Sequence, residues 1–388
     1  MTTFTRSVVL STIGASLFGN SLTKEERDAG WLKRFNDATN LNETDMPAEV
    51  LGKLQELRTR IQANLSQGNM AAIRRQSAEL NGLYGFYEDQ LAHGKPDMHF
   101  LIATDTYQGR LAAELVQGHL HHCGLNADIH VPRELSTRNT TAFSNGMRDL
   151  IAWCEDILPG YQQNGYQVVF NLVAGFKSLQ GYLNIIGMFY ADRLIYIFDA
   201  PTADLISIPK LPIRLDLDQI RRYAAHLAML DAEIEPLPLD AFSHLPEMFI
   251  EHVQDGAAVK VILSTWGRLV WSRAKAEVLA EALLHFPRLD YTDLFRKTAE
   301  ALPKHERAAL QERLGRVAAH LMARQGDPAS MKTDSMLQYD NYVNKAGQDG
   351  VPIGHFRANN QGYRVSCESR SGTLVLRKYG PHAINDKP

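Results

Sequence analysis

The amino-acid sequence predicts an α/β fold with a parallel sheet over residues 1–212, then a helical segment, then a small α+β domain. Two observations carry this prediction. In the first part, apolar strand-like segments alternate with amphipathic helical segments, as in right-handed βαβ units. Near its end, Pro209 and Pro212 interrupt an edge-strand pattern and mark the exit from the domain.

The first part begins with one strand and then leaves the sheet. We expect that strand at 7–11, followed by a glycine-containing turn, and two amphipathic helices within 47–91. Strand patterns resume at HFLIATDT. From there we expect strands at 99–104, 128–131, 167–172 and 194–198, helices at 108–121, 148–158 and 178–190, and an edge strand within 205–216.

Residues 213–287 are expected to form a helical connector, and residues 288–388 the last domain. In the connector we expect helices at 220–230 and 242–253 and then a β-hairpin at 259–272 with Gly267 at its bend. Helices followed by a hairpin are compatible with a winged helix or with a plain connector. In the last domain we expect a helix at 306–325, ended by Gly326 and Pro328, and strands at 353–358, 363–369 and 373–380.

Composition limits the classes of function. Hydrophobic residues make up 45% and charged residues 22%, which is typical of a soluble globular protein. No apolar run reaches the ~18 residues of a membrane span, and the N-terminus does not read as a secretory signal, so we expect a cytoplasmic protein without a membrane partner. Cys123, Cys154 and Cys367 are widely spaced and odd in number, so we expect neither a disulfide framework nor a bound metal.

Charge is unevenly distributed. From Phe286 to the end there are 16 Lys and Arg against 11 Asp and Glu, whereas the other 285 residues carry 25 against 33. A basic end on an acidic body suggests a polyanionic partner for that end. An uneven surface without function accounts for the same numbers.

Three loops are expected to meet at the carboxyl edge of the parallel sheet, where open α/β sheets bind ligands. They are STIGASLFGN, ATDTYQG and NLVAGFKS. Their hydroxyls, their glycines and the N–H groups at helix starts suit phosphate or ribose. Lys177 is expected in a first helical turn, where the helix dipole disfavours a structural cation, so an anion beside it is favoured over a solvated lysine. The candidate ligand-binding residues are Thr12, Gly14, Ser16, Asn20, Thr104, Asp105, Thr106, Gly175, Phe176 and Lys177.

Neither GxxxxGK[ST] nor GxGxxG is present, so ordinary mononucleotide or dinucleotide binding is poorly supported. Instead, VVLSTIGASLFGN, LIATDTYQGRLAAELV and VVFNLVAGFKSLQGYLNIIGMFYADRLIYIFD resemble the Rossmann-like CRISPR-associated ligand-sensing (CARF) domain over roughly residues 6–212. The family usually has Thr-Gly-Gly before the lysine, where this chain has Val173, Ala174 and Gly175. That departure removes a hydroxyl contact and keeps the lysine.

This resemblance implies a homodimer that binds a cyclic oligoadenylate across its two-fold axis. Cyclic tetra-adenylate is the expected activator, ahead of cyclic hexa-adenylate, and no other cofactor is expected. Some members of the family also cleave the ring slowly. For that activity, Lys177 and Ser16 are the candidates in this chain.

A second group of candidates lies on the expected C-terminal strands. HFRANNQGYRVSCESRSGTLVLRKYGPH contains His355, Arg357, Arg364, Lys378 and His382, and side chains two apart on a strand share a face. A cationic face can attract an RNA phosphate and stabilise charge during cleavage, and a histidine can transfer protons near neutral pH. A sheet that is basic only for solubility would show the same residues.

Residues 288–388 resemble the RelE family of ribosome-dependent mRNA interferases. The resemblance rests on a helix followed by an Asp-Pro dipeptide, the motif FRxxxxGYRV, a polar hairpin and a final strand that ends in GPH. The resemblance implies mRNA and the ribosome as partners. It implies that Arg364 stabilises the scissile phosphate. It also implies that His382 lies at the position where the family often has an arginine that acts as the general acid. His355 and Arg357 lie at positions where the family often has two lysines, one of which acts as the general base. Because arginine stays protonated, His355 or His382 would have to move protons.

The two resemblances together predict an endoribonuclease of type III CRISPR immunity, activated by a cyclic oligoadenylate and independent of metal, that cleaves mRNA in the ribosomal A site. A ligand-responsive winged-helix transcription regulator is one alternative. A stand-alone nuclease of the cyclic ligand, with an inert C-terminal part, is another.

Overall fold

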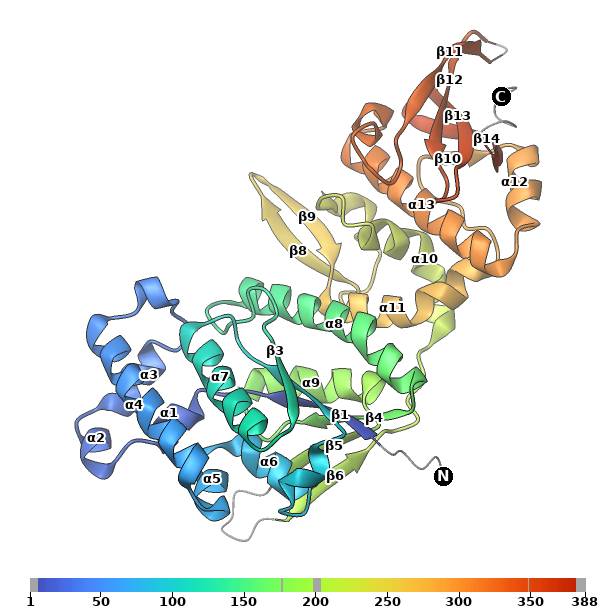
Figure 1. Ribbon diagram of the computed structural model, residues 1–388. Coiled ribbons are helices and arrows are strands. Elements are labelled where there is room, and N and C mark those ends of the chain that lie inside the picture. Colours follow the sequence, from blue (N-terminus) through green and yellow to red (C-terminus); the bar gives the residue numbers. More distant parts are fainter. Residues whose placement is uncertain (1–5, 176, 198–203, 348, 382–388) are drawn as a thin grey trace. The chain divides into compact units, whose positions relative to one another are not determined.

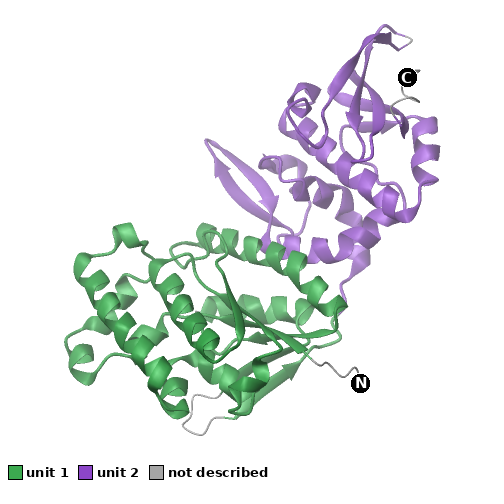
Figure 2. Ribbon diagram, viewed as in Figure 1, with its two compact units in different colours: residues 1–213 green, residues 214–388 purple. Residues whose placement is uncertain are grey.

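The structure is a computed structural model that describes residues 6–175, 177–197, 204–347 and 349–381. It divides into two compact units, residues 1–213 and 214–388 (Figure 2). Two of the candidate residues, Phe176 and His382, lie outside the described residues. In the described part of the chain, no helix is both long and apolar enough to cross a membrane.

Unit 1 is built on a six-stranded sheet of order β3-β2-β1-β4-β5-β6 (Figure 1). The first five strands pair in parallel, and β6 is antiparallel to β5. The predicted parallel sheet with an edge strand is therefore confirmed. The strands are β1 (Arg6–Thr12), β2 (Met98–Ile102), β3 (Asn126–His130), β4 (Tyr166–Asn171), β5 (Arg193–Ile197) and β6 (Leu205–Pro209).

Helices cover both faces of this sheet, which explains why its central strands are apolar without alternation. Val9, Leu101 and Val169 share a buried cluster with helices α4 (Ala48–Gln67), α6 (Ala78–Phe86) and α7 (Tyr107–His122). On the opposite face, Phe100 lies edge-to-face with Trp153 of α8 (Thr140–Gln163), with ring centroids 5.0 Å apart. Helix α9 (Lys177–Tyr190) packs against Leu194 of β5 through Gly187.

The excursion between β1 and β2 contains more helices than the sequence predicted. Two amphipathic helices were expected within 47–91, and the structure has α4, α5 (Met70–Gln76) and α6 there. The segment before them adds α1 (Ser16–Asn20), α2 (Lys24–Asp28) and α3 (Trp31–Asp37). The break between α5 and α6 falls at Ser77, which caps α6 by accepting from the N–H of Leu80 at 3.1 Å.

Unit 2 combines helices with two sheets. A five-stranded sheet has the order β10-β14-β13-β12-β11, and a three-stranded sheet has the order β7-β9-β8. Its strands are β7 (Leu237–Pro238), β8 (Ile250–Asp255), β9 (Ala258–Leu263), β10 (Leu289–Tyr291), β11 (Asp340–Ala346), β12 (Pro352–Arg357), β13 (Tyr363–Arg370) and β14 (Thr373–Pro381). Its helices are α10 (Leu217–Asp231), α11 (Thr265–Ala280), α12 (Asp293–Glu300) and α13 (Lys304–Ala323).

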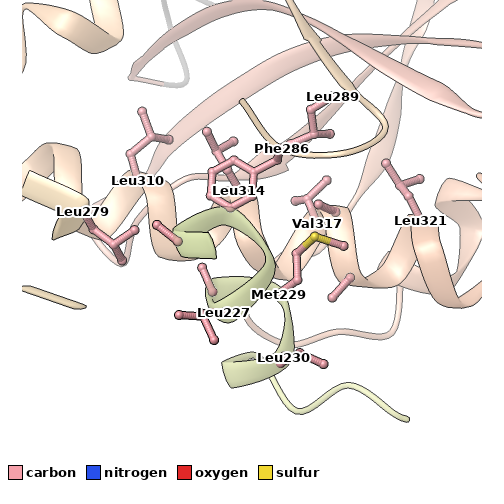
Figure 3. Packing of buried hydrophobic residues seen from close by; sticks show 14 of the residues in the cluster. Leu227, Met229, Leu230, Leu279, Phe286, Leu289, Leu310, Leu314, Val317 and Leu321 are labelled. Carbon is pink, nitrogen blue, oxygen red and sulfur yellow. The ribbon is translucent and has the colours of Figure 1, made fainter. Parts of the chain in front are cut away.

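One hydrophobic cluster runs through the expected connector and the expected C-terminal domain. Figure 3 shows Leu227 of α10 and Leu314 of α13 in this cluster, together with Phe286. At the contact between the two helices, a Cβ on Gly315 would lie 3.0 Å from the carbonyl oxygen of Ala228. The close approach of the backbones means that α10 and α13 share a core.

Two expected elements of the connector are wrong. Residues 242–253 do not form a helix: turns reach to Phe249, and β8 begins at Ile250. The hairpin is formed by β8 and β9, with its bend at Gly256 and Ala257; Gly256 has φ +61°, and glycine at the first position favours a two-residue hairpin turn. No helix occurs among residues 242–249, so the helix that was to precede the wing of a winged helix is not present there.

Gly267 lies in a helix rather than at a bend. Ser264 caps α11 by accepting a hydrogen bond from the N–H of Gly267 at 2.9 Å. The apolar run that follows, with Leu269, Val270 and Trp271 buried, resembles a strand in composition but supplies the buried side of this helix.

We expect Gly267→Ala to lower the free energy of unfolding by roughly 1–3 kcal/mol, because overpacking has that cost. The new Cβ would lie 2.5 Å from the carbonyl oxygen of Phe249. Urea titration followed by circular dichroism measures the change. In the control, Gly118→Ala in α7, the new Cβ meets nothing within 4 Å, so that exchange should stabilise by ~0.5–1 kcal/mol. Equal responses of the two variants would contradict the packing described for Gly267.

Candidate functional site

The candidate ligand site lies at the carboxyl edge of the unit 1 sheet, where β1 and β4 lie side by side (Figure 1). The chain after β1 continues to β2 on one side of it, whereas β4 lies on the other side, so the strand order reverses between β1 and β4. Such a switch point leaves a crevice outside the strand ends, and it is the usual ligand position in open α/β sheets. The loops at 13–15 and 172–175 form its walls.

These two loops approach each other closely. The hydroxyl of Thr12 donates to the carbonyl oxygen of Ala174, which ties the end of β1 to the loop after β4. A Cβ on Gly14 would lie 3.2 Å from the backbone nitrogen of Gly175, and Gly175 itself has φ +105°. The glycines are therefore needed for the loop contact, and the Thr12 hydroxyl is engaged in it.

The third loop is held by its own hydrogen bonds. Thr106 caps α7 by accepting from the N–H of Gly109 at 3.1 Å, and its hydroxyl lies 3.0 Å from that of Thr104. Asp105 accepts from Arg110 at 2.6 Å and from the N–H of Glu134 at 2.9 Å. Partial burial acts to raise the pKa of Asp105, but these two donors outweigh it and hold the pKa below its ordinary value. These side chains shape the loop.

The remaining candidates lie at the surface. Ser16 and Lys177 are exposed, and Lys177 is the first residue of α9, which has no acidic residue in its first turn. Asn20 is also exposed, but its amide donates to the carbonyl oxygen of Gln76 at 3.2 Å. Lys177 and Ser16 are therefore the side chains of this set best placed to meet an anion from solvent.

Glu79 is a residue of this edge that the sequence prediction missed. It is 1% exposed, and its carboxylate accepts from the N–H of Gly14 at 2.7 Å and from the Ser77 hydroxyl at 2.7 Å. Burial raises its pKa, against the effect of these hydrogen bonds. Asn171, at the end of β4, joins it by donating to the Glu79 carbonyl oxygen at 3.0 Å. The N–H of Gly14, a candidate ligand-binding residue, thus already has a carboxylate partner.

The second candidate site is one face of the five-stranded sheet in unit 2. The register places Arg357 directly opposite Arg364, and His355 opposite Ser366. Ser366 in turn lies opposite Lys378. Because opposite residues in antiparallel strands project to the same side, these candidates share one face.

An edge strand that the sequence prediction omitted completes this face. In β11, Tyr342 stacks on the His355 imidazole, with ring centroids 4.3 Å apart and an interplanar angle of 21°. The ammonium of Lys345 lies 5.0 Å from the centre of the Tyr342 ring. Asp340 lies opposite His355 in the register. The polar character of 340–346 hid this strand, because edge strands lack the apolar alternation of buried ones.

Arg357 and Arg364 repel each other across the strand pair. Burial, followed by the nearby Arg357 guanidinium, lowers the pKa of Arg364, while Tyr342 acts in the opposite direction. Like charges directly opposite in a sheet are destabilising unless an anion lies between them. The pair is therefore suited to a phosphate group.

Tyr379 does not take part in this face. Its strand position pairs with Val365, and both side chains are buried in the hydrophobic cluster. Burial raises the pKa of Tyr379 to about 12.

The histidines at the end of α7 serve the fold. Buried His119 bonds to the carbonyl oxygen of Leu65 at 2.9 Å and lies 3.3 Å from the hydroxyl of Tyr84. Within the described ranges, no group of three or more His, Cys, Asp and Glu side chains is arranged to hold a metal ion.

A comparison with protein families bears on unit 1. Residues 74–211 match the model of a family described as CRISPR-associated protein (Cas_APE2256). The match supports a CRISPR-associated protein. It begins in α5 and extends past β6, so it includes the loops after β2 and β4 and does not include β1 and the loop after it.

We expect Glu79→Gln to change how stability depends on pH. The raised pKa means that folded Glu79 keeps its proton above the ordinary value of 4.5, where the unfolded chain loses it. Unfolding then releases protons, so the Glu79 contribution to the free energy of unfolding falls as pH rises from 4.5 through the folded pKa. The variant has no such contribution, and its stability relative to the wild type should rise with pH.

Thermal melts between pH 4.5 and 8 measure this difference. Glu114→Gln, at a side chain that is 53% exposed, is the control and should show a flat difference. A flat difference for Glu79→Gln as well would mean that burial does not perturb the Glu79 carboxyl.

Proposed function

We propose that this chain is a CRISPR-associated endoribonuclease that a cyclic oligoadenylate, most of all cyclic tetra-adenylate, activates to cleave mRNA on the ribosome. The single observation that carries the nuclease assignment is the opposition of Arg357 and Arg364 beside His355 on one sheet face. The family match of residues 74–211 supports the CRISPR setting, and the glycine-lined switch point supports an anionic ligand in unit 1.

Cleavage on this face uses the ribose next to the scissile phosphate. The 2′-oxygen forms a bond to phosphorus, the bond from phosphorus to the 5′-oxygen breaks, and a 2′,3′-cyclic phosphate and a 5′-hydroxyl result. Arg357 and Arg364 stabilise the charge that gathers on the phosphoryl oxygens. His355 accepts the 2′-hydroxyl proton, since imidazole titrates near neutral pH and guanidinium does not. In this proposal His382 donates a proton to the 5′-oxygen as that oxygen leaves.

Activation begins at the unit 1 switch point. A homodimer would present two copies of the loops at 13–15 and 172–175 to a ligand that itself has two-fold symmetry. In each copy Lys177 and Ser16 are exposed to meet a phosphate. Slow cleavage of the ring at these residues remains part of this proposal.

We expect Arg364→Ala to reduce mRNA cleavage by roughly 100- to 1000-fold, the usual effect of removing one group that stabilises a developing oxyanion. The assay is a purified translation system with and without cyclic tetra-adenylate, in which mRNA 3′ ends are mapped. Arg324→Ala is the control, because Arg324 is 57% exposed at the end of α13 and pairs with Glu235 at 3.0 Å. Cleavage by Arg364→Ala at the wild-type rate would remove the proposed nuclease site.

We expect Lys177→Glu to weaken binding of cyclic tetra-adenylate by roughly 100-fold, because charge-assisted hydrogen bonds from two symmetric copies are lost. Isothermal titration calorimetry measures it. Lys210→Glu is the control, because Lys210 is exposed and lies at the opposite edge of the sheet from the switch point. Lys210 follows Pro209, the last residue of β6, which pairs with the first residue of β5. If Lys177→Glu and Lys210→Glu bind equally, the switch point is not the ligand site.

A further inference from the structure

Helix α6 contacts the loop at 13–15, which is one wall of the unit 1 switch point. The Glu79 carboxylate of this helix accepts from the N–H of Gly14 at 2.7 Å. Its other oxygen accepts at 2.7 Å from the hydroxyl of Ser77, the residue that caps α6, so the start of the helix fixes the direction of the carboxylate. Because Gly14 and Glu79 are both buried, the Gly14 N–H needs this carboxylate as its partner while the loop keeps its present position.

The same helix contacts the loop at 172–175, which is the other wall. A Cβ on Gly82 would lie 2.9 Å from Cγ2 of Val173 and would also meet the side-chain amide of Asn171. Asn171 in turn donates from Nδ2 to the Glu79 carbonyl oxygen at 3.0 Å. The glycine at position 82 therefore permits an approach between α6 and the end of β4 that a larger residue would prevent.

The hydrophobic core holds α6 in place, whereas the walls are loops. Leu80 and Leu83 of α6 are fully buried, in the cluster that also contains Val9 of β1. The walls include glycines that allow other backbone conformations, and Gly175 has φ +105°. Sites built on helices and strands are held more precisely than sites built on loops, so a helix that contacts both walls can supply the precision that the loops lack.

We propose that Glu79 and Gly82 are positioning residues for ligand binding, through which α6 holds the two walls of the switch point in the arrangement that a cyclic oligoadenylate requires. Both residues are buried, so they act through the loops and do not touch the ligand. If either contact is lost, the walls are in the binding arrangement for a smaller fraction of the time, and the apparent dissociation constant rises by the reciprocal of that fraction. The inference rests on the proposed function and adds to it a role for the excursion between β1 and β2.

The first test compares Glu79→Met, which removes the acceptor for Gly14, with Asp97→Leu in the full-length protein. Asp97 is the matched control because it is 6% exposed and its Oδ1 accepts from the N–H of Ser7 at 2.7 Å, at the other end of β1. Calorimetric titration with cyclic tetra-adenylate measures affinity, and thermal melts measure stability. Both variants should lower the melting temperature, but only Glu79→Met should raise the dissociation constant, by about tenfold.

A second pair of variants tests the other wall. Gly82→Ala should also weaken ligand binding, because the new methyl group would push against Val173. Gly85→Ala is its control in the same helix. There a Cβ would lie 3.1 Å from Cδ1 of Ile197 and 3.4 Å from Cδ1 of Leu205, which are the ends of flexible side chains on β5 and β6. Gly85→Ala should therefore leave the affinity unchanged.

Two further measurements separate positioning from a general loss of stability. Glu79→Gln keeps an oxygen that can accept from Gly14, so it should bind cyclic tetra-adenylate as the wild type does. Hydrogen–deuterium exchange of the loop at 13–15 needs no ligand, and it should be faster in Glu79→Met and unchanged in Asp97→Leu.

The positioning role and the proposed function fail separately. If the wild type binds no cyclic tetra-adenylate, the proposed ligand is wrong, and exchange in the loop at 13–15 still decides whether α6 positions that wall. The positioning role is overturned if Glu79→Met and Gly82→Ala bind the ligand as tightly as the wild type, or if Asp97→Leu weakens binding as much as Glu79→Met. Equal exchange in the loop for Glu79→Met and the wild type would overturn it as well.

Discussion

Two guanidinium groups of like charge, Arg357 and Arg364, are held opposite each other by the register of β12 and β13. The residues on the other side of the same strands fix that register, because Phe356 and Val365 pair directly and are fully buried. A shift by one residue would expose both of them and bury the arginines. The hydrophobic core of unit 2 thus maintains a charge arrangement that the arginines by themselves would not adopt. His355 and Lys378 take their places from the same register.

The periodic parts of the chain were predictable from sequence. The alternation of strands and helices from residue 99 to 209, and the three last strands, agree with the structure, because both faces of β1 and β4 are covered and the pattern is strong. The connector was not predictable in the same way. At 264–272 a run with Trp266, Leu269, Val270 and Trp271 has strand composition, but the cap at Ser264 starts a helix. The sequence pattern predicted a helix at 242–253, but in the structure Pro246 lies in a turn, where its carbonyl oxygen accepts from the N–H of Phe249.

The candidate sites show where sequence reasoning stops. Motif analysis predicted the loops at 13–15 and 172–175 and named Gly14 as a candidate ligand-binding residue, whereas in the structure the Gly14 N–H donates to the Glu79 carboxylate. Glu79 lies 65 residues from Gly14 in sequence, so only the folded chain relates them. Its one sequence signal is a charged residue within the largely apolar helix AELNGLYGF. Tyr342 was missed for a similar reason, since its contact with His355 depends on an edge strand of polar composition.

The close contact between Gly315 and Ala228 has a consequence for how this protein could have arisen. A domain that folds by itself can be moved between chains as a module. Here α13 would present Leu314 and Val317 to water if α10 were removed, because these side chains share their burial with Leu227. The five-stranded sheet and the segment before it therefore form one folding unit. A single cut near residue 288 would therefore separate elements that share one hydrophobic core and would expose the apolar side chains of α10 and α13 to water.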